Sequence, residues 1–327
     1  MARTARYVTS TGTDTYANST SSSTPMSLTT AFANAAAGDD IYVKADATYT
    51  RTASDTPANN GTVANPIQYI GYSATITDGY LGRTNGNGPL VTSNYPTIAY
   101  NSGFGLTASI KTFTIWKTLL ITGSIAGNVI IVGGNNALIS CSINNAADSA
   151  VSVGVSFSGA SGISLDTDVT CSGASLAGFG YSVAGSGTRI IGGRISVSQN
   201  ACIRLTASTA TVFAAFVTFL PCLNGVVFAD TSTFTGLNCT AYGLGGDFFQ
   251  HPNFAMTNTS LLVNCMGTDS NYFARSLYSA TAVNPLLRAY NRTRDNANVD
   301  TGFTDWPEYG RITTDTGGPE TDYVAAG

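Results

Sequence analysis

Two aspartates separated by a single residue, Asp166 and Asp168, have the spacing of a site that does chemistry. On a β-strand, residues i and i+2 point to the same face, so the two carboxylates would converge. Converging carboxylates can bind calcium, or one can act as general acid and the other as general base. A calcium site needs six or more oxygen ligands, however, and no other acidic residue lies close by in the sequence. We therefore expect a solvated, inert pair at a turn and no metal site.

Three arginines, Arg189, Arg194 and Arg204, fall on successive runs of β-branched residues. Stacked in a ladder, their guanidinium groups could bind an anionic sugar. The simpler interpretation is that exposed arginines keep one face of the protein in water. We expect no catalytic residues. If the chain is an enzyme, its catalytic residues would be Asp166, Asp168, Arg189 and Arg194.

Charged residues are scarce throughout the chain. Of 327 residues, 15 are basic and 19 acidic, which makes 10% of the chain charged, with a net charge of −4 and a pI near 4.8. A typical soluble domain is about a quarter charged, so hydroxyl and amide side chains must form most of the polar surface here. The acidic balance excludes the basic surface that nucleic-acid binding requires.

Neither a signal peptide nor a membrane span is recognisable. Two arginines stand near the N-terminus without the apolar block of a signal peptide, and no window holds the ~20 consecutive apolar residues of a span. The six cysteines are widely spaced without a C-x-x-C motif. In a reducing cytoplasm, buried free thiols explain them better than disulfides do. We expect no cofactor, no nucleic acid, no membrane contact, and assembly in the host cytoplasm.

The pattern along the chain is that of short strands and turns. One short helix is predicted over residues 27–36, with Ser27 as its N-cap, and a strand follows at 41–44. From about residue 105 to 289, runs of β-branched and aromatic residues end in Gly, Asn, Asp or Ser. Related fragments recur roughly every 20 to 30 residues, which is typical of a solenoid. Stacked coils also explain the scarcity of charge, because like side chains in adjacent coils lie ~4.8 Å apart.

The first 75 residues resemble the N-terminal cap and first coils of pectate-lyase-like right-handed parallel β-helices. The residues that carry the resemblance are Tyr7-Val8, Gly12-Thr13-Asp14, Gly38-Asp39-Asp40-Ile41-Tyr42-Val43, Tyr49, Asn65-Pro66-Ile67 and Ile70-Gly71-Tyr72. The resemblance implies an all-β fold, a right-handed single-stranded parallel β-helix (β-solenoid), in which a short N-terminal capping helix closes the open end. It also implies that a lyase of this class would need its arginine base beside a cluster of acidic calcium ligands.

The C-terminal residues lack any period and hold an unusual share of the charges. We therefore expect three regions, namely an N-terminal cap with the first coils at 1–75, the parallel β-helix body at 76–289, and an extended C-terminal arm at 290–327.

The run 211–220 is apolar at every alternate position on both faces, so part of it must be covered. Either a loop, the arm or a second subunit would cover it, and we favour a homotrimer because exposed apolar patches mark interfaces. The predicted interface residues are Val212, Phe213, Phe216, Phe219, Trp306 and Tyr309. The two in the arm could instead fold back on their own β-helix.

These observations favour a non-enzymatic structural protein of a tailed-phage virion, a trimeric capsid decoration (cement) protein on the outer surface. Its partners would be the major capsid protein or other virion subunits, with a surface glycan as a further partner. The alternative is a polysaccharide lyase or depolymerase, or a glycan-binding tailspike, of the pectate-lyase-like class. Fold resemblance alone does not choose between these functions.

Overall fold

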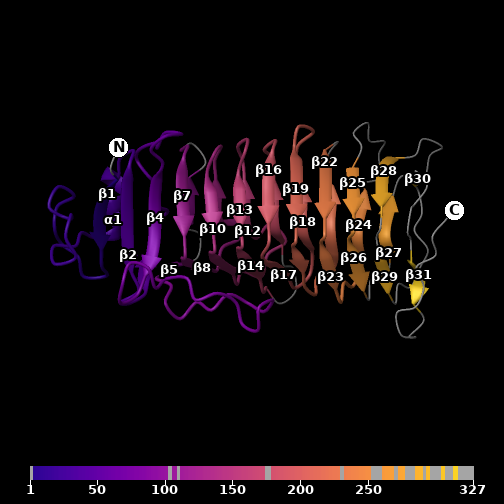
Figure 1. The fold of residues 1–327 in the computed structure, drawn as a ribbon, viewed down its shortest axis with the longest axis horizontal. Coiled ribbons are helices and arrows are strands. Elements are labelled where there is room, and N and C mark those ends of the chain that lie inside the picture. The colour runs from indigo at the N-terminus through magenta and orange to yellow at the C-terminus, as the bar shows by residue number, and fades with distance from the viewer. Residues whose placement is uncertain are drawn as a thin grey trace.

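The chain folds into a rod of stacked coils (Figure 1). The structure is a computed structural model and describes residues 3–101, 105–108, 111–173, 178–228, 232–251, 260–268, 272–276, 284–289, 292–294, 303–305 and 312–315. Within these ranges, each coil contributes strands to parallel sheets that run along the rod. This confirms the predicted parallel β-solenoid.

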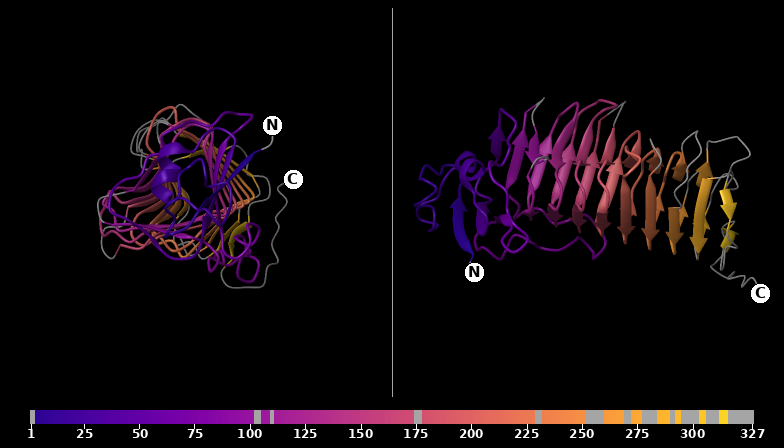
Figure 2. Two further views of the ribbon diagram at one scale, coloured as in Figure 1. Left: turned by 90° about the vertical axis from the view of Figure 1, so that its left-hand side faces the viewer. Right: turned by 90° about the horizontal axis from the view of Figure 1, so that it is seen from above.

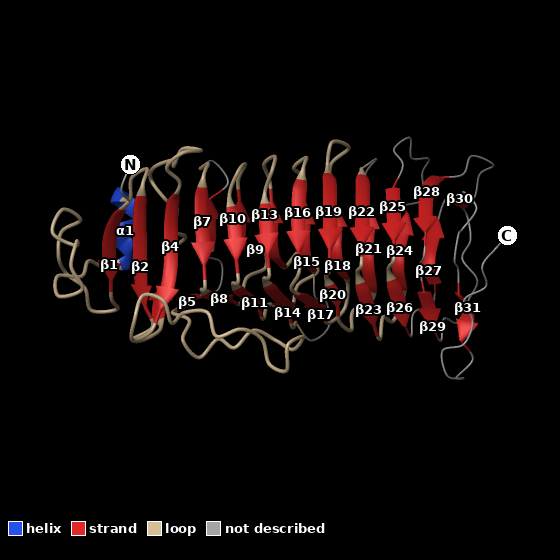
Figure 3. Ribbon diagram, viewed as in Figure 1, coloured by secondary structure: helices blue, strands red, loops and turns tan. Residues whose placement is uncertain are grey.

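Three sheets form the walls of the rod (Figure 3). The first sheet contains β1 (Thr4–Val8), β2 (Asp39–Lys44), β4 (Ile67–Tyr72), β7 (Thr114–Lys117), β10 (Ala137–Ile139), β13 (Ile163–Leu165), β16 (Thr188–Ile191), β19 (Thr211–Ala215), β22 (Thr233–Leu237), β25 (Ser260–Val263), β28 (Asn284–Ala289) and β30 (Phe303–Asp305). The second sheet contains β3 (Tyr49–Arg51), β5 (Thr97–Tyr100), β8 (Leu120–Gly123), β11 (Ser142–Asn145), β14 (Asp168–Cys171), β17 (Arg194–Val197), β20 (Thr218–Phe219), β23 (Thr240–Tyr242), β26 (Met266–Thr268), β29 (Arg292–Arg294) and β31 (Ile312–Asp315). The third sheet contains β6 (Leu106–Ala108), β9 (Asn128–Val132), β12 (Val153–Phe157), β15 (Phe179–Val183), β18 (Ala201–Leu205), β21 (Asn224–Phe228), β24 (Asp247–His251) and β27 (Tyr272–Ser276).

The single helix in the described part, α1 (Leu28–Asn34), lies across the N-terminal end of the rod (Figure 2). Ser27 is its N-cap and accepts a hydrogen bond from the backbone N–H of Thr30, as the sequence predicts. Phe32 packs its ring against Tyr69 and Trp116, at centroid distances of 5.3 and 6.1 Å. The helix therefore covers the first core residues, which would otherwise face water.

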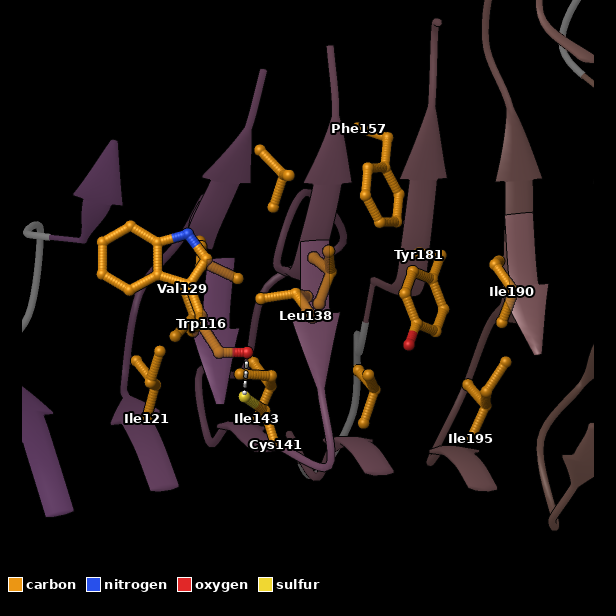
Figure 4. Close-up of a cluster of buried hydrophobic side chains, with 14 of the residues drawn as sticks. Trp116, Ile121, Val129, Leu138, Cys141, Ile143, Phe157, Tyr181, Ile190 and Ile195 are labelled. Carbon is orange, nitrogen blue, oxygen red and sulfur yellow. Dashed lines mark hydrogen bonds between the residues drawn. The ribbon is translucent and has the colours of Figure 1, made fainter. Parts of the chain in front are cut away.

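The core is built of columns of inward side chains, one from each coil (Figure 4). In the first sheet, Trp116 lies in register with Leu138 of the next coil, and both are fully buried. The rings of Tyr69 and Trp116 stack at 4.5 Å. All six cysteines are buried, as expected. Like side chains in adjacent coils thus pack on one another along the rod, in line with the strand spacing.

From β7 to β25, a two-residue turn joins each strand of the first sheet to the next strand of the second, and its first residue has a positive φ. The residues at this position are Thr118, Ser140, Asp166, Gly192, Phe216, Asn238 and Asn264. Glycine and asparagine adopt this left-handed conformation readily, whereas a bulky side chain adopts it at a cost. Phe216, with φ 57°, is therefore a strained member of the column.

The outward faces of the first two sheets differ in chemistry. One outward column of the first sheet consists of Ile139, Leu165, Ile191, Ala215, Leu237 and Val263. On the second sheet, a corresponding outward column consists of Thr122, Asn144, Thr170 and Ser196. From β10 to β25 this column of the first sheet is thus apolar, although Lys117 precedes it on β7, whereas the column of the second sheet presents hydroxyl and amide groups.

The run 211–220 is not one strand. It forms β19, a turn at Phe216, and β20, so its alternation reverses at the turn. Val212 and Phe219 are buried in the core, which makes their prediction as interface residues wrong. Phe213 and Phe216 are exposed, by 36% and 61%. Trp306 and Tyr309 lie outside the described residues.

Strands β29, β30 and β31 fall within the segment 290–327, for which we predicted an extended arm. They pair in parallel with earlier strands of the first and second sheets. These residues at least continue the coils. The boundaries between the three predicted regions remain predictions.

Candidate functional site

A long loop, residues 73–96, replaces the usual short turn between β4 and β5 and runs along the rod beside the second sheet (Figure 1). Asp78 fixes its start, because its carboxylate accepts hydrogen bonds from the backbone N–H groups of Ser73, Ala74 and Thr75. These bonds hold the pKa of Asp78 below its usual value. The bonds between the Asp78 carboxylate and these backbone groups therefore fix the conformation of the first part of the loop.

Arg83, in this loop, binds both predicted aspartates. Its Nε atom lies 2.6 Å from Oδ1 of Asp166, and its Nη2 atom lies 2.8 Å from Oδ1 of Asp168. The Arg83 and Asp168 side chains are largely buried, and Asp166 is 27% exposed. Burial tends to lower the pKa of Arg83, but the hydrogen bonds to Asp168 and Asp166 raise it. We call these three residues the Arg83 clamp.

The remaining carboxylate oxygens of the clamp are also engaged. Oδ2 of Asp166 accepts a hydrogen bond from the Tyr80 hydroxyl at 2.9 Å. Oδ2 of Asp168 accepts one from the backbone N–H of Leu90, and its Oδ1 accepts a second one from the backbone N–H of Arg194. No oxygen of the pair is thus left without a donor.

The Arg83 clamp corrects the prediction for Asp166 and Asp168. They do not lie on one strand, because Asp166 is the first turn residue between β13 and β14, and Asp168 begins β14. The expected turn is confirmed, but Asp168 is buried, so the pair is not simply solvated. Carboxylates already neutralised by a guanidinium do not fit a calcium site or an acid–base pair. Among the described residues, no group of three or more His, Cys, Asp or Glu side chains is placed to bind a metal.

A groove with a volume of about 680 Å³ opens beside the Arg83 clamp. Its lining residues come from the loop, the turn column and the second sheet, and are Arg83, Gly86, Asn87, Asp166, Gly192, Gly193, Arg194, Phe216, Thr218, Leu220, Asn238, Thr240 and Tyr242. It spans β14, β17, β20 and β23, or about 14 Å of the rod at the usual strand spacing. This volume is in the range of ligand sites.

Arg194 supplies a cation to the groove without a counter-ion. Its Nε atom is inaccessible and has no hydrogen-bond partner, and in the described part of the chain its guanidinium forms no ion pair. Thr218 and Thr240 follow it in register on the next two coils. A guanidinium without a counter-ion attracts anions, so an anionic group in the groove would stabilise its charge.

Two aromatic rings line the groove and remain in contact with solvent. Phe216 is 61% exposed and Tyr242 is 44% exposed. At the position of Phe216, the next two coils carry Asn238 and Asn264, whose side chains hydrogen-bond to each other. Phe216 thus lies between Gly192 and this asparagine pair in the turn column, has a strained backbone and leaves its ring in water. Strain of this kind indicates a functional position.

The arginine ladder, which was the less favoured alternative, does not form. Arg189 lies on β16 of the first sheet, Arg194 on β17 of the second, and Arg204 on β18 of the third. Arg204 covers the ring of Phe179, with its guanidinium carbon 4.7 Å from the ring centroid. Successive runs in the sequence are successive walls of one coil, so only Arg194 reaches the groove.

Sequence reasoning missed Arg83, Tyr80 and Tyr242. The loop that holds Arg83 and Tyr80 has no period, so its path along the rod could not be deduced. The scarcity of charge was a signal that could have identified Arg83, because this residue is an isolated cation in a region with very few acids.

In the part of the chain that is described, no helix is long and apolar enough to cross a membrane.

Solved structures of several polysaccharide lyases align with this chain over most of its length. The pectate lyase Pel9A aligns with a TM-score of 0.63 and 14% identity, over 94% of this chain and 80% of that one. A rhamnogalacturonan lyase aligns with a TM-score of 0.64 and 12% identity, over 94% and 87% of the two chains. An alginate lyase from Paenibacillus sp. str. FPU-7 aligns with a TM-score of 0.57 and 14% identity, over 85% and 96%.

The chain has the pectate-lyase-like parallel β-helix fold. Identities this low establish the fold of the β-helix alone. No protein-family model matches the sequence, and the search of curated proteins finds no match. What the β-helix binds must therefore be argued from its own groove.

Proposed function

We propose that this β-helix binds an acidic glycan in the groove between loop 73–96 and the second sheet, without cleaving it. The observation that carries the proposal is Phe216, an exposed aromatic ring held in a strained turn inside the groove. Aromatic faces pack against the apolar faces of sugar rings, and solvent exposure of the ring is otherwise a cost. Polysaccharide lyases with the same fold, named for pectate and alginate, support the choice of an acidic sugar.

Arg194 gives the groove its preference for an acidic sugar. Its guanidinium lies in the same groove as Phe216 and Tyr242, and the hydroxyl groups of Thr218 and Thr240 continue the polar wall. A sugar carboxylate beside Arg194 would supply a counter-ion to its guanidinium, which forms no ion pair in the described part of the chain. The Arg83 guanidinium is already neutralised by two aspartates. It therefore helps to form the wall of the groove but adds little net positive charge to it.

Calorimetric titration with oligogalacturonate and oligoalginate tests the proposal, with a neutral maltooligosaccharide for comparison. We expect binding of an acidic oligosaccharide, weakened at least about tenfold by Phe216→Asn and by Arg194→Gln. Phe213→Asn and Arg189→Gln are matched controls, because both side chains lie on the first sheet outside the groove. Absence of binding, or an equal loss in all four variants, would overturn the proposal.

The expected outcome of catalysis assays is no cleavage. The carboxylates predicted for a lyase, Asp166 and Asp168, are bound by Arg83. The check is the absorbance of unsaturated product after incubation with the same oligosaccharides and Ca²⁺. A rise that Asp166→Ala abolishes would establish an enzyme of the lyase class instead.

A second candidate function is structural, and the apolar outward column of the first sheet favours it. Six aliphatic residues from consecutive coils form this column; Ala215 is buried, and Leu165 is 40% exposed. We propose a homotrimer that packs this face around a common axis, as a decoration protein of a tailed-phage virion bound to the major capsid protein. Copies of one chain share the same strand spacing, so their columns can match coil for coil.

Light scattering tests the structural candidate, since a trimer has three times the 33.7 kDa mass of the chain. Leu165→Glu should yield monomers, because a charge would be buried at the contact. Thr170→Glu, at an outward position of the second sheet, is the matched control and should stay trimeric. A wild-type monomer at micromolar concentration would refute the trimer. If the protein is a trimer, its binding to purified capsids would test the virion location.

A further inference from the structure

Two buried cysteines from consecutive coils, Cys202 and Cys222, lie in direct contact. Cys202 belongs to β18, and Cys222 lies in the connection between β20 and β21. Their Sγ atoms are 3.0 Å apart, and the side chains are 0% and 5% exposed. The Sγ atom of Cys222 also lies 3.0 Å from the carbonyl oxygen of Asn224.

This contact is close to the geometry of a disulfide. A disulfide needs an S–S distance of about 2.05 Å and Cα atoms about 4.4 to 6.8 Å apart. Cys222 lies just before β21, whose strand pairs with β18, so its side chain reaches Cys202 from an offset position. To meet the distance condition, the two sulfur atoms, now 3.0 Å apart, must approach by about 1 Å.

A second pair of thiols, Cys239 and Cys265, makes an instructive contrast. Their flanking residues pair in register, Leu237 with Val263 and Thr240 with Met266, so the two cysteines are stacked directly on each other. Their Cβ atoms then follow the strand spacing of about 4.8 Å, which exceeds the usual Cβ separation of a disulfide. The side chains of Cys239 and Cys265 nevertheless interact with each other, and their hydrogen bond lowers the pKa of Cys239 and raises that of Cys265. Cys202 and Cys222 differ in being offset along the chain, with Sγ atoms 3.0 Å apart.

We propose that Cys202 and Cys222 form a disulfide that links two consecutive coils when the protein folds in the presence of a small-molecule disulfide such as oxidised glutathione. One thiolate attacks the small disulfide and releases one equivalent of small thiol. The second cysteine then attacks the mixed disulfide and releases another. The two cysteines lose two protons and two electrons, and the small disulfide accepts the electrons.

Burial decides when this reaction takes place. It raises the pKa of Cys202 well above its usual value, and only the thiolate attacks a disulfide. The folded protein therefore reacts slowly, while the unfolded or partly folded chain reacts readily. Once formed, the bond is protected from reduction by the same burial.

The disulfide would also stiffen one end of the groove. Cys222 follows Leu220 by two residues, and Leu220 lines the groove. The segment from Phe216 to Leu220 would then be held by a covalent link just beyond its end. The proposal does not depend on the glycan or virion function, because it rests on the two thiols alone.

Refolding of the full chain in reduced and in oxidised glutathione buffers tests the proposal. After alkylation under denaturing conditions, mass spectrometry should count two fewer free thiols in the oxidised sample, and peptide mapping should link Cys202 to Cys222. Thermal unfolding should shift upward by about 5 °C relative to the reduced protein. Peptide mapping needs no variant, so the result does not depend on how a substitution folds.

Two variants separate this pair from the other. Cys222→Ser should abolish both the loss of thiols and the thermal shift, whereas Cys239→Ser should retain both. Six alkylated cysteines after oxidised refolding would overturn the proposal. So would a linked peptide that contains Cys239 and Cys265 but not Cys202.

Discussion

The Nε atom of Arg83 lies 2.6 Å from the Oδ1 atom of Asp166, across a sequence separation of 83 residues. This pair brings a loop that begins after β4 to the turn that follows β13. The carboxylate therefore acts as an anchor for one wall of the groove. Asp166, a candidate catalytic residue in the sequence, thus has a structural role. Under the proposed function, its neighbours Arg194 and Phe216 contact the glycan.

Removal of the cation of the Arg83 clamp should destabilise the fold. Arg83→Ala should lower the free energy of unfolding by about 3 kcal/mol, because the largely buried Asp168 and the partly exposed Asp166 lose their counter-ion. Urea unfolding measures the change. Arg189→Ala, an exposed arginine with no ion pair among the described residues, should cost less than about 0.5 kcal/mol. Equal effects of the two substitutions would show that the clamp adds no stability.

Relief of the strained turn should stabilise the protein while it impairs binding. Phe216→Asn should raise the free energy of unfolding by about 1 kcal/mol, since asparagine tolerates φ 57° and can join the ladder of Asn238. The same substitution should weaken glycan binding. Phe213→Asn, on the regular strand β19, should give no gain in stability. A destabilised Phe216→Asn variant would contradict the strain argument.

Stability should fall at alkaline pH, in part through Tyr16. Burial and the hydrogen bond from its hydroxyl to Asp39 raise the pKa of Tyr16 from 10.0 to about 12. The unfolded chain loses this proton near pH 10 and the folded chain only near pH 12. The stabilising contribution is therefore complete below pH 10 and is lost as the pH rises through 12. Melting temperatures across this range should decline less steeply for Tyr16→Phe, and identical slopes would count against the assignment.

Removal of the side chain that covers the N-terminal end of the core should destabilise the protein. Phe32→Ala should lower the free energy of unfolding by about 3 to 5 kcal/mol, because it removes the ring that covers Tyr69 and Trp116. Ser27→Ala should cost about 1 kcal/mol through loss of the N-cap. Asn34→Ala, at an exposed position of the same helix, serves as the control in thermal unfolding. If Asn34→Ala lowers the free energy of unfolding as much as Phe32→Ala does, the covering of the core by Phe32 is not what stabilises this end.

Much of the fold could be predicted from the sequence because local signals and the global fold agree. The N-cap at Ser27 lies at the start of α1, and the strand expected at 41–44 lies within β2. Cysteines that recur about once per coil proved to be core residues. Each of these features depends on neighbours in the sequence or on a repeat that the sequence shows directly.

The site was harder to predict because it depends on contacts between distant coils. Alternation fails at 211–220 because a left-handed residue, Phe216, reverses which side chains face inward. Nothing in the local sequence marks a phenylalanine as a turn residue. The partner of Asp166 is a residue of a non-periodic loop, and only the three-dimensional path of that loop brings Arg83 to it.

Loop 73–96 also fixes how many coils can lie between its origin and its anchor. It leaves the rod after β4, and the first sheet passes through β7 and β10 before it reaches β13 and Asp166. Loss of one coil in this stretch would move the anchor by about 4.8 Å and break the ion pair. The described coils beyond β17 lie past the anchor and are free of this restriction. Evolution could therefore lengthen or shorten the rod at its C-terminal half by whole coils, while the N-terminal half keeps a set length.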